Sequence, residues 1–337
     1  MRAVAWVTLS IVALIVLVLG GFRVAAAVRE RDTPDEAAPR HGRLVPAGDV
    51  RIFVQEAGHA GNPAVLCMHG TGAWSETWRP TLANLAAQGF RSFAMDAPPF
   101  GFSSKPATAR YDNEAQADRI LALMDALRLD RAVLVAHSFG ARATVAAALR
   151  APHRVSHLVL VDSALGLSAN AAENAALPVQ SDPGLAGSVL SVPWLRNVVV
   201  ASTAANPFLT RRLVEGFVDD PRSVTPAIVA LYQAPMHALG GTEHVGAWAH
   251  AFVTGDEIAL RSNVHALPAS GIRVSLIWGE RDAVTPLAQA EYLHAAIPGS
   301  DLRVVPGVGH IPHLEAPEEF ARALAATLAE DRSPSAR

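Results

Sequence analysis

The chain has 337 residues, of which 50% are hydrophobic and 18% are charged, a composition typical of globular proteins with a large core. Lysine and arginine number 28 against 31 aspartates and glutamates, so the formal net charge is −3 and the basic excess of a nucleic-acid-binding protein is missing. The single cysteine, Cys67, excludes an intrachain disulfide and a cysteine-rich metal cluster.

The first predicted element is an apolar N-terminal helix. Residues 3–22 contain no charge and would form a helix of about 30 Å, which is the thickness of a bilayer core. We expect residues 1–28 to be an uncleaved membrane anchor, because Arg23 and the length of the apolar stretch are unusual for a cleaved signal. The alternative is a signal peptide with Ala25 and Ala27 at the cleavage site, which would leave a secreted or periplasmic protein.

Residues 29–42 are charged and contain Pro34, a composition typical of a solvated linker, so we expect the folded body to begin at Arg43. Short β-branched runs bounded by turn residues predict buried strands at residues 50–55, 64–68, 91–96, 132–136, 157–162, 273–278 and 302–306. Apolar positions at helical spacing predict helices at residues 81–88, 113–129, 139–150, 287–296 and 317–328.

This alternation predicts an α/β fold, with a mostly parallel central sheet and helices on both faces, built from residues 43–163 and 269–330. The alternation of strand and helix patterns stops at residues 164–268. We expect this segment to form an inserted helical cap with helices near residues 207–218 and 226–239. The insert has only 13 charged residues, which favours an apolar substrate group. Four large aromatic residues are expected to pack in the core or the cap: Trp78, Trp194, Phe208 and Trp248.

The chemistry begins where the strand predicted at residues 132–136 meets the next helix. Ala136-His137-Ser138-Phe139-Gly140 is a small-X-Ser-X-Gly turn, which projects a serine hydroxyl clear of the sheet. Ala136 and Gly140 leave room for the tight turn, although Ala136 replaces the more usual glycine. The helix N-terminus that follows aims the Phe139 N–H at negative charge on a substrate oxygen. Taken alone, Ser138 is also compatible with an ordinary helix N-cap.

Other polar residues follow the ends of neighbouring predicted strands. His69-Gly70-Thr71-Gly72 follows one strand and can present the Thr71 N–H as a second oxyanion donor. Asp282 and His310 follow two later strands. Because the carboxyl ends of parallel strands meet at one edge of the sheet, these side chains are expected beside Ser138. Their order in the chain, serine then aspartate then histidine, matches a hydrolase triad.

At these residues the sequence resembles the α/β-hydrolase fold superfamily, in particular its cap-bearing serine hydrolases. The segments that carry the resemblance are His69-Gly70-Thr71-Gly72, Asp96-Ala97-Pro98-Pro99-Phe100-Gly101-Phe102-Ser103, Ala136-His137-Ser138-Phe139-Gly140, Trp278-Gly279-Glu280-Arg281-Asp282 and Gly309-His310. The resemblance implies a serine nucleophile, a histidine base, an orienting carboxylate and two backbone oxyanion donors, at Ser138, His310, Asp282, Thr71 and Phe139 respectively.

The leading hypothesis is a membrane-tethered enzyme that cleaves a small or medium apolar carboxylic ester through an acyl-enzyme on Ser138. Two alternatives use the same residues, a carbon–carbon bond hydrolase and a cofactor-free perhydrolase or haloperoxidase-like enzyme. A third is a non-catalytic binding protein on a hydrolase scaffold.

Several nearby titratable residues compete for the same roles. Asp162 is an alternative acid, His313 an alternative base, and His137 an expected packing neighbour of the nucleophile. The other histidines show no paired spacing with carboxylates that predicts a metal site, so no metal and no cofactor are expected. The predicted partners are a small-molecule substrate and, through the N-terminal segment, a membrane, with no nucleic acid.

Overall fold

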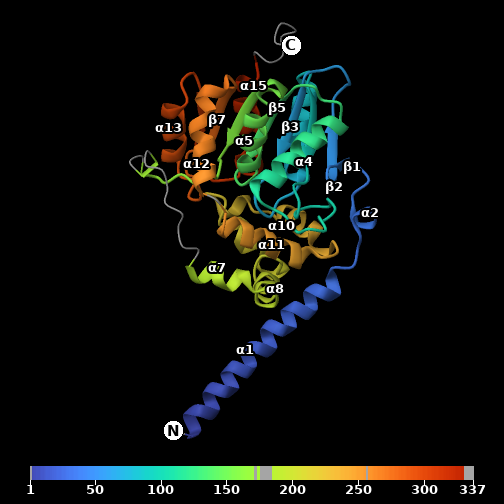
Figure 1. The fold of residues 1–337 in the computed structure, drawn as a ribbon, viewed down its shortest axis with the longest axis vertical. Coiled ribbons are helices and arrows are strands. Elements are labelled where there is room, and N and C mark those ends of the chain that lie inside the picture. The colour runs from blue at the N-terminus through green and yellow to red at the C-terminus, as the bar shows by residue number, and fades with distance from the viewer. Residues whose placement is uncertain (1, 171–172, 175–183, 256, 330–337) are drawn as a thin grey trace.

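The computed structural model describes residues 2–170, 173–174, 184–255 and 257–329, and eight strands form one central sheet within them (Figure 1). The strand order is β1-β2-β4-β3-β5-β6-β7-β8, with β2 antiparallel to β1 and β4 and every neighbouring pair from β4 to β8 parallel. The strands are β1 (Arg43–Ala47), β2 (Val50–Ala57), β3 (Ala64–Met68), β4 (Arg91–Met95), β5 (Ala132–His137), β6 (Val155–Val161), β7 (Arg273–Gly279) and β8 (Asp301–Val305). The predicted fold class is confirmed.

The sequence analysis missed β1. This strand contains Pro46, and a proline within an apolar run argues against a strand because it cannot donate a ladder hydrogen bond. At the sheet edge the missing donor costs little, because only one side of the strand is paired, and β1 pairs with β2 alone.

Helices cover both faces of the sheet because successive strand residues point to opposite sides. In β3, Val65 and Cys67 belong to the apolar cluster under α3 (Arg79–Ala87) and α15 (Pro317–Thr327), whereas Leu66 and Met68 belong to the cluster on the other face. The second face is covered by α4 (Asn113–Ala126), α5 (Gly140–Arg150) and α13 (Leu287–Ala296).

Between β6 and β7 the described residues contain helices and no strand. These are α7 (Gly184–Ser191), α8 (Pro193–Ser202), η3 (Pro207–Leu209), α9 (Thr210–Glu215), η4 (Pro221–Ser223), α10 (Pro226–Gln233), η5 (Ala234–His237), α11 (Gly241–Val253), α12 (Glu257–Ala266) and η6 (Leu267–Ser270). Residues 171–172, 175–183 and 256 of the predicted insert lie outside the described residues. The helices from α7 to α11 lie at the carboxyl end of the parallel strands (Figure 1).

Two details of the predicted insert differ from the structure. Helix α12 was expected in the cap, but its Leu260 and Val264 pack into the main core against the sheet. The helix expected at residues 226–239 ends at Gln233, because Pro235 cannot continue an α-helix, and the chain turns into the short η5.

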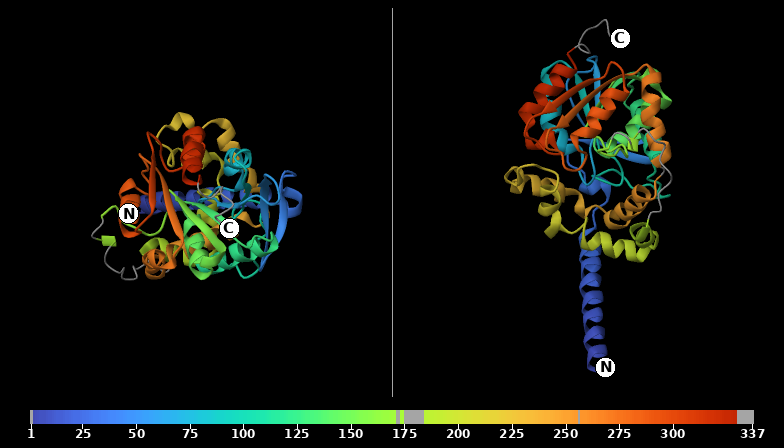
Figure 2. Two further views of the ribbon diagram at one scale, coloured as in Figure 1. Left: turned by 90° about the horizontal axis from the view of Figure 1, so that it is seen from above. Right: turned by 90° about the vertical axis from the view of Figure 1, so that its left-hand side faces the viewer.

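The N-terminal helix α1 (Arg2–Arg29) projects away from the body, and the insert helices lie between it and the sheet (Figure 2). Within its segment Val4–Arg29, an 18-residue stretch has a mean hydropathy of 2.6 and is only 6% buried, so length and composition suffice to cross a membrane. Helix α1 packs against α8.

The segment predicted as a solvated linker is instead attached to the body. It contains the short helix α2 (Pro34–Ala37), and Asp32 pairs with Ala238 in a parallel bridge. The carboxylate of Asp35 accepts two hydrogen bonds from Arg51 on β2, at 2.6 and 2.7 Å. Charged residues here therefore form contacts that composition alone does not reveal.

Candidate active site

The turn after β5 holds Ser138 in a strained backbone conformation. Its φ is +51°, a value that non-glycine residues rarely adopt. Two glycines make this turn possible, because a Cβ at Gly140 would lie 2.5 Å from the His69 carbonyl oxygen and one at Gly70 would lie 2.6 Å from His137 Nδ1. Only glycine fits at these two positions, because neighbouring atoms approach the backbone closely on either side of the serine.

A chain of two hydrogen bonds joins Ser138, His310 and Asp282. The Ser138 Oγ lies 2.8 Å from His310 Nε2, and His310 Nδ1 lies 2.8 Å from Asp282 Oδ2. All three residues are buried, and they follow β5, β8 and β7 at the same edge of the sheet. The structure therefore brings together three residues that are up to 172 positions apart.

Thr285, which the sequence analysis missed, holds the Asp282 carboxylate in place. Its hydroxyl donates to Asp282 Oδ2 at 2.6 Å, while the N–H groups of Val284 and Thr285 donate to Oδ1. Burial alone would raise the pKa of Asp282, but hydrogen bonds from His310 and Thr285 outweigh it and keep that pKa below its usual value. The Asp-X-X-Thr spacing in the loop was the signal that could have revealed this contact.

In the part of the chain that the structure describes, the alternative acid Asp162 makes no hydrogen bond with the His310 ring. Its Oδ1 accepts from the Gly279 N–H at 2.8 Å. Burial and the adjacent Asp282 carboxylate raise the pKa of Asp162 well above its ordinary value, which favours its protonated form. We interpret Asp162 as a group behind Asp282 whose protonated form is favoured.

The same three residues, Asp162, Asp282 and His310, lie close enough to ligate a cation, with candidate ligand atoms within 4.8 Å of one another. The His310–Asp282 hydrogen bond already uses the ring nitrogen that would face such an ion. The raised pKa of Asp162 also favours a proton over a hard cation at this carboxyl group. The hydrogen-bonded arrangement thus accounts for the cluster.

Two backbone amides flank the serine. The N–H groups of Thr71 and Phe139 donate no hydrogen bond to any residue that the structure describes. Both residues line a cavity of about 130 Å³ together with Ser138 and His310. Unpaired amides beside a hydroxyl can stabilise an oxyanion that forms there.

The insert is tied directly to the loop that carries His310. The His310 N–H donates to the Phe217 carbonyl at 2.7 Å, and Glu315 accepts from the N–H groups of Gly309, Asp219 and Asp220. These contacts join segments nearly 100 residues apart, and no local pattern predicts them. The position of the imidazole thus depends on how the insert docks.

The other histidines near the site have structural partners. His137 Nε2 lies 2.7 Å from the His310 carbonyl, and the His313 ring stacks on Trp78 with centroids 4.3 Å apart. Burial lowers the pKa of His69 to about 4 and that of His313 to about 3, and it holds the pKa of His137 well below 6.5. His313 is therefore a buried neutral ring, not a second base at Ser138.

These neutral histidines predict acid lability. In the unfolded chain they take up protons near pH 6.5, but in the folded chain His69 does so only near pH 4 and His313 near pH 3. The unfolded state binds more protons between these values, so the free energy of unfolding should fall by about 1.4 kcal/mol per histidine for each pH unit below about 6.5.

Urea denaturation of wild type and His313→Phe between pH 7 and 4.5 measures the free energy of unfolding and so checks the predicted acid lability. Phenylalanine keeps a flat ring against Trp78 but cannot titrate. Below about pH 6.5, we expect the free energy of unfolding of His313→Phe to fall by about 1.4 kcal/mol less for each pH unit than that of wild type. Equal slopes for the two proteins would contradict the assignment.

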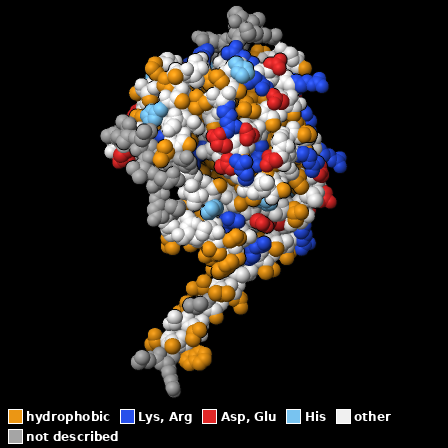
Figure 3. Space-filling model, in the orientation of Figure 1, with side chains coloured by type: hydrophobic (Ala, Val, Ile, Leu, Met, Phe, Trp, Pro, Cys, Tyr) orange, Lys and Arg blue, Asp and Glu red, His pale blue; other side chains and the backbone are white. Residues whose placement is uncertain are grey.

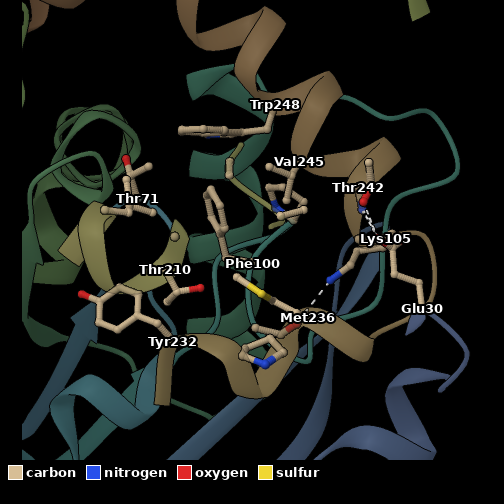
Figure 4. Close-up of a pocket in the computed structure, with 18 residues that line it drawn as sticks. Glu30, Thr71, Phe100, Lys105, Thr210, Tyr232, Met236, Thr242, Val245 and Trp248 are labelled. Atoms are coloured by element: carbon tan, nitrogen blue, oxygen red, sulfur yellow. Dashed lines mark hydrogen bonds between the residues drawn. The ribbon is translucent and has the colours of Figure 1, made fainter. Parts of the chain in front are cut away.

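A second cavity of about 140 Å³ adjoins the first, since Thr71 and Tyr232 line both. Figure 4 shows Thr71 on one side of it and Lys105, Thr242 and Glu30 on the other. Lys105, the only lysine of the chain, donates to the carbonyls of Gly101 and Ser103. Burial lowers the pKa of Lys105 to about 8, against the influence of Asp96 and Glu30.

A family model described as the alpha/beta hydrolase fold matches residues 63–215. The 2-hydroxy-6-oxo-2,4-heptadienoate hydrolase of Pseudomonas putida is 30% identical over 289 residues, which cover 83% of this chain and 94% of the relative. The 2-hydroxymuconate semialdehyde hydrolase of a Pseudomonas species is 31% identical over 302 residues, covering 87% of this chain and 95% of the relative.

Among solved structures, a membrane phospholipase A described as a bacterial virulence factor superposes with a TM-score of 0.64 at 24% identity. The match covers 99% of this chain and 100% of the other. At that identity the likeness supports the fold.

Proposed function

Because the chain belongs to the alpha/beta hydrolase fold family, we propose that it is a serine hydrolase in which Ser138 attacks a carbonyl carbon. The observation that carries the proposal is the chain of hydrogen bonds that joins Ser138, His310 and Asp282. His310 takes the proton of the Ser138 hydroxyl, and Asp282 fixes the imidazole tautomer and stabilises its charged form. The N–H groups of Thr71 and Phe139 stabilise the oxyanion.

The bond broken is a carbon–carbon bond beside a carbonyl. The relatives' names support this, because a 2-hydroxy-6-oxo-dienoate contains no ester, and its hydrolysis therefore cleaves carbon from carbon next to the 6-oxo group. The 2-hydroxyl proton of the dienoate first moves to C5, which gives a 2,6-dioxo-3-enoate in which C5 is saturated. The Ser138 Oγ then adds to the C6 ketone carbon, and the oxyanion collapses while the C5–C6 electron pair passes through the C3–C4 double bond to the C2 oxygen. His310 returns the serine proton to this dienolate, and water then hydrolyses the acyl-serine to a carboxylic acid.

Lys105 supports this substrate class. A dienoate carries a carboxylate, and Lys105 supplies a positive charge in the cavity that adjoins Ser138. Its ammonium has three donors, of which two contact carbonyl oxygens, so one remains for a substrate carboxylate. A neutral ester would gain nothing from this charge.

We expect Lys105→Met to raise KM for 2-hydroxy-6-oxo-2,4-heptadienoate by about 10- to 100-fold, the value of one charge-assisted hydrogen bond. The KM for p-nitrophenyl butyrate should change far less. Lys105→Arg keeps the charge and should restore most of the dienoate affinity. Equal losses for both substrates in Lys105→Met would argue against carboxylate binding.

Ester hydrolysis, the leading hypothesis of the sequence analysis, is the second candidate. It is favoured by the apolar lining of the cavity at Ser138, which includes Phe217, Phe252 and Ile311, and by the likeness to a membrane phospholipase along almost the whole chain. Comparison of kcat/KM for the dienoate and for p-nitrophenyl esters of increasing chain length decides between the two. A higher value for the esters would overturn carbon–carbon cleavage.

We also infer that α1 remains attached as a membrane anchor. Its last turn is built into the body, since Ala26 is 1% exposed and the Arg29 guanidinium donates to the carbonyls of Ala205 and Met236. The Glu30 carboxylate is buried and accepts from the Thr242 N–H and hydroxyl. Removal of residues 1–27 would expose the surface that covers Ala26.

A further inference from the structure

One side of the insert exposes large apolar side chains. Phe208 is 88% exposed and Trp194 is 69% exposed, although the sequence analysis expected both to pack. We call the surface that they form with their exposed neighbours the apolar cap face, made of Leu185, Trp194, Phe208, Leu209, Leu213 and Leu239. Several large apolar side chains exposed on one part of a protein mark a binding site.

The apolar cap face lies beside the point where α1 leaves the body. Arg29 binds the carbonyl of Ala205, three residues before Phe208, and the Leu239 N–H donates to the Asp32 carbonyl at 2.8 Å. Trp194 belongs to α8, which packs against α1. Hydrophobic side chains gather on the underside of the body around this exit (Figure 3).

The composition of α7 and α8 also fits a bilayer surface. Together the two helices are as apolar as a membrane span, but the chain bends by 109° between them, so they cannot cross a bilayer as one straight helix. An apolar helix pair with exposed side chains suits the membrane interface, where tryptophan is preferred, and Trp194 on α8 is exposed. Arg212, on the same surface, has no ion pair with any described residue and suits the lipid headgroup layer.

A series of cavities leads inward from this face. Thr203, Leu209 and Arg212 line an open depression that shares Ala204 and Leu213 with the 140 Å³ cavity. That cavity in turn shares Thr71 and Tyr232 with the cavity at Ser138. Shared lining residues therefore connect the apolar cap face to the serine.

We propose that the apolar cap face rests on the lipid bilayer and admits a membrane-partitioned carbonyl substrate through these cavities to Ser138. The proposal rests on the proposed roles of α1 and Ser138. The occupant is a bilayer because α1, once inserted, holds the lipid surface next to this face at high effective concentration. A free apolar surface so close to a membrane span gains free energy by entering the interface.

Fluorescence at position 208 tests the docking. Cys67 is buried and burial raises the pKa of its thiol, so Phe208→Cys provides one reactive site for an environment-sensitive dye. The full-length variant is reconstituted into phosphatidylcholine–phosphatidylglycerol vesicles. Val304→Cys on β8, 40% exposed in the sheet domain, is the matched control.

We expect vesicles to shift the emission at position 208 to the blue and to reduce iodide quenching several-fold, with no change at position 304. Equal quenching at both positions in protein that floats with the vesicles would overturn the docking. Protein that fails to float would overturn the anchor as well.

Activity tests the route. For Phe208→Asp and Trp194→Asp, the rate on a long-chain ester embedded in vesicles, divided by the rate on soluble p-nitrophenyl butyrate, should fall about tenfold relative to wild type. Val304→Asp should leave this ratio unchanged. An unchanged ratio in all three variants would overturn delivery from the bilayer. If wild type cleaves neither ester, the same ratio is measured with soluble and alkyl-chain dienoates. If wild type cleaves none of these substrates, the proposed role of Ser138 is overturned. The fluorescence experiment then still decides whether the apolar cap face docks on the bilayer.

Discussion

Ser138→Ala is expected to lower kcat/KM by about 10⁴- to 10⁶-fold on any substrate that wild type cleaves, because the acyl-enzyme cannot form without the hydroxyl. The side chain is small and 6% exposed, and its loss removes only the hydrogen bond to His310. The folded structure should therefore survive the change. Steady-state kinetics on the purified full-length protein measures the effect.

A fluorophosphonate probe gives an independent readout of the same residue. Wild type should form a covalent adduct at Ser138, and Ser138→Ala should not. A matched control is Ser163→Ala, which removes another buried serine hydroxyl near the end of β6 and should leave labelling intact. Folded wild-type protein that resists the probe and cleaves no substrate would instead support a non-catalytic binding protein on this scaffold.

Replacement of the two neighbouring aspartates by asparagine should have very different effects. Asp282→Asn removes the charge that holds the His310 tautomer, and such a change typically lowers kcat by about 10⁴-fold. Burial and the Asp282 carboxylate disfavour the charged form of Asp162, and an asparagine can keep the contact with the Gly279 N–H through its carbonyl oxygen. Asp162→Asn should therefore reduce kcat by less than about tenfold, since the asparagine keeps this hydrogen bond.

The comparison of these two variants identifies the orienting acid. Both substitutions conserve side-chain shape, and both sites are buried, so differences in folding are small and thermal denaturation can verify them. If Asp162→Asn proved the more damaging change, Asp162 would be the functional partner of His310, and Asp282 would not be the residue that fixes the imidazole tautomer.

The fold class and the sheet edge that carries the site were predictable because they follow from local constraints. β-branched runs form strands, small residues permit the turn at Ser138, and the carboxyl ends of parallel strands converge. The same constraints predicted that Ser138, Asp282 and His310 would meet, as their contacts show. Strand β1 was missed because the local penalty of Pro46 does not apply at an edge.

The surroundings of the site depend on contacts between distant segments, which local patterns do not encode. Composition predicted a solvated linker at residues 29–42, yet Glu30 is buried against Thr242, 212 residues away. Hydrophobicity predicted that Trp194 and Phe208 would pack, yet both are exposed. Whether an apolar side chain is covered depends on what the rest of the chain places over it.

The amino-acid sequence by itself therefore determined the fold class, the serine turn and the order of the candidate site residues, since steric and periodic rules act over a few neighbouring positions. The tertiary structure alone decided that Thr285 and Phe217 hold Asp282 and His310 in place, and that Glu30, just after α1, lines the second cavity. These contacts exist only once loops from separate strand ends and the insert have packed together.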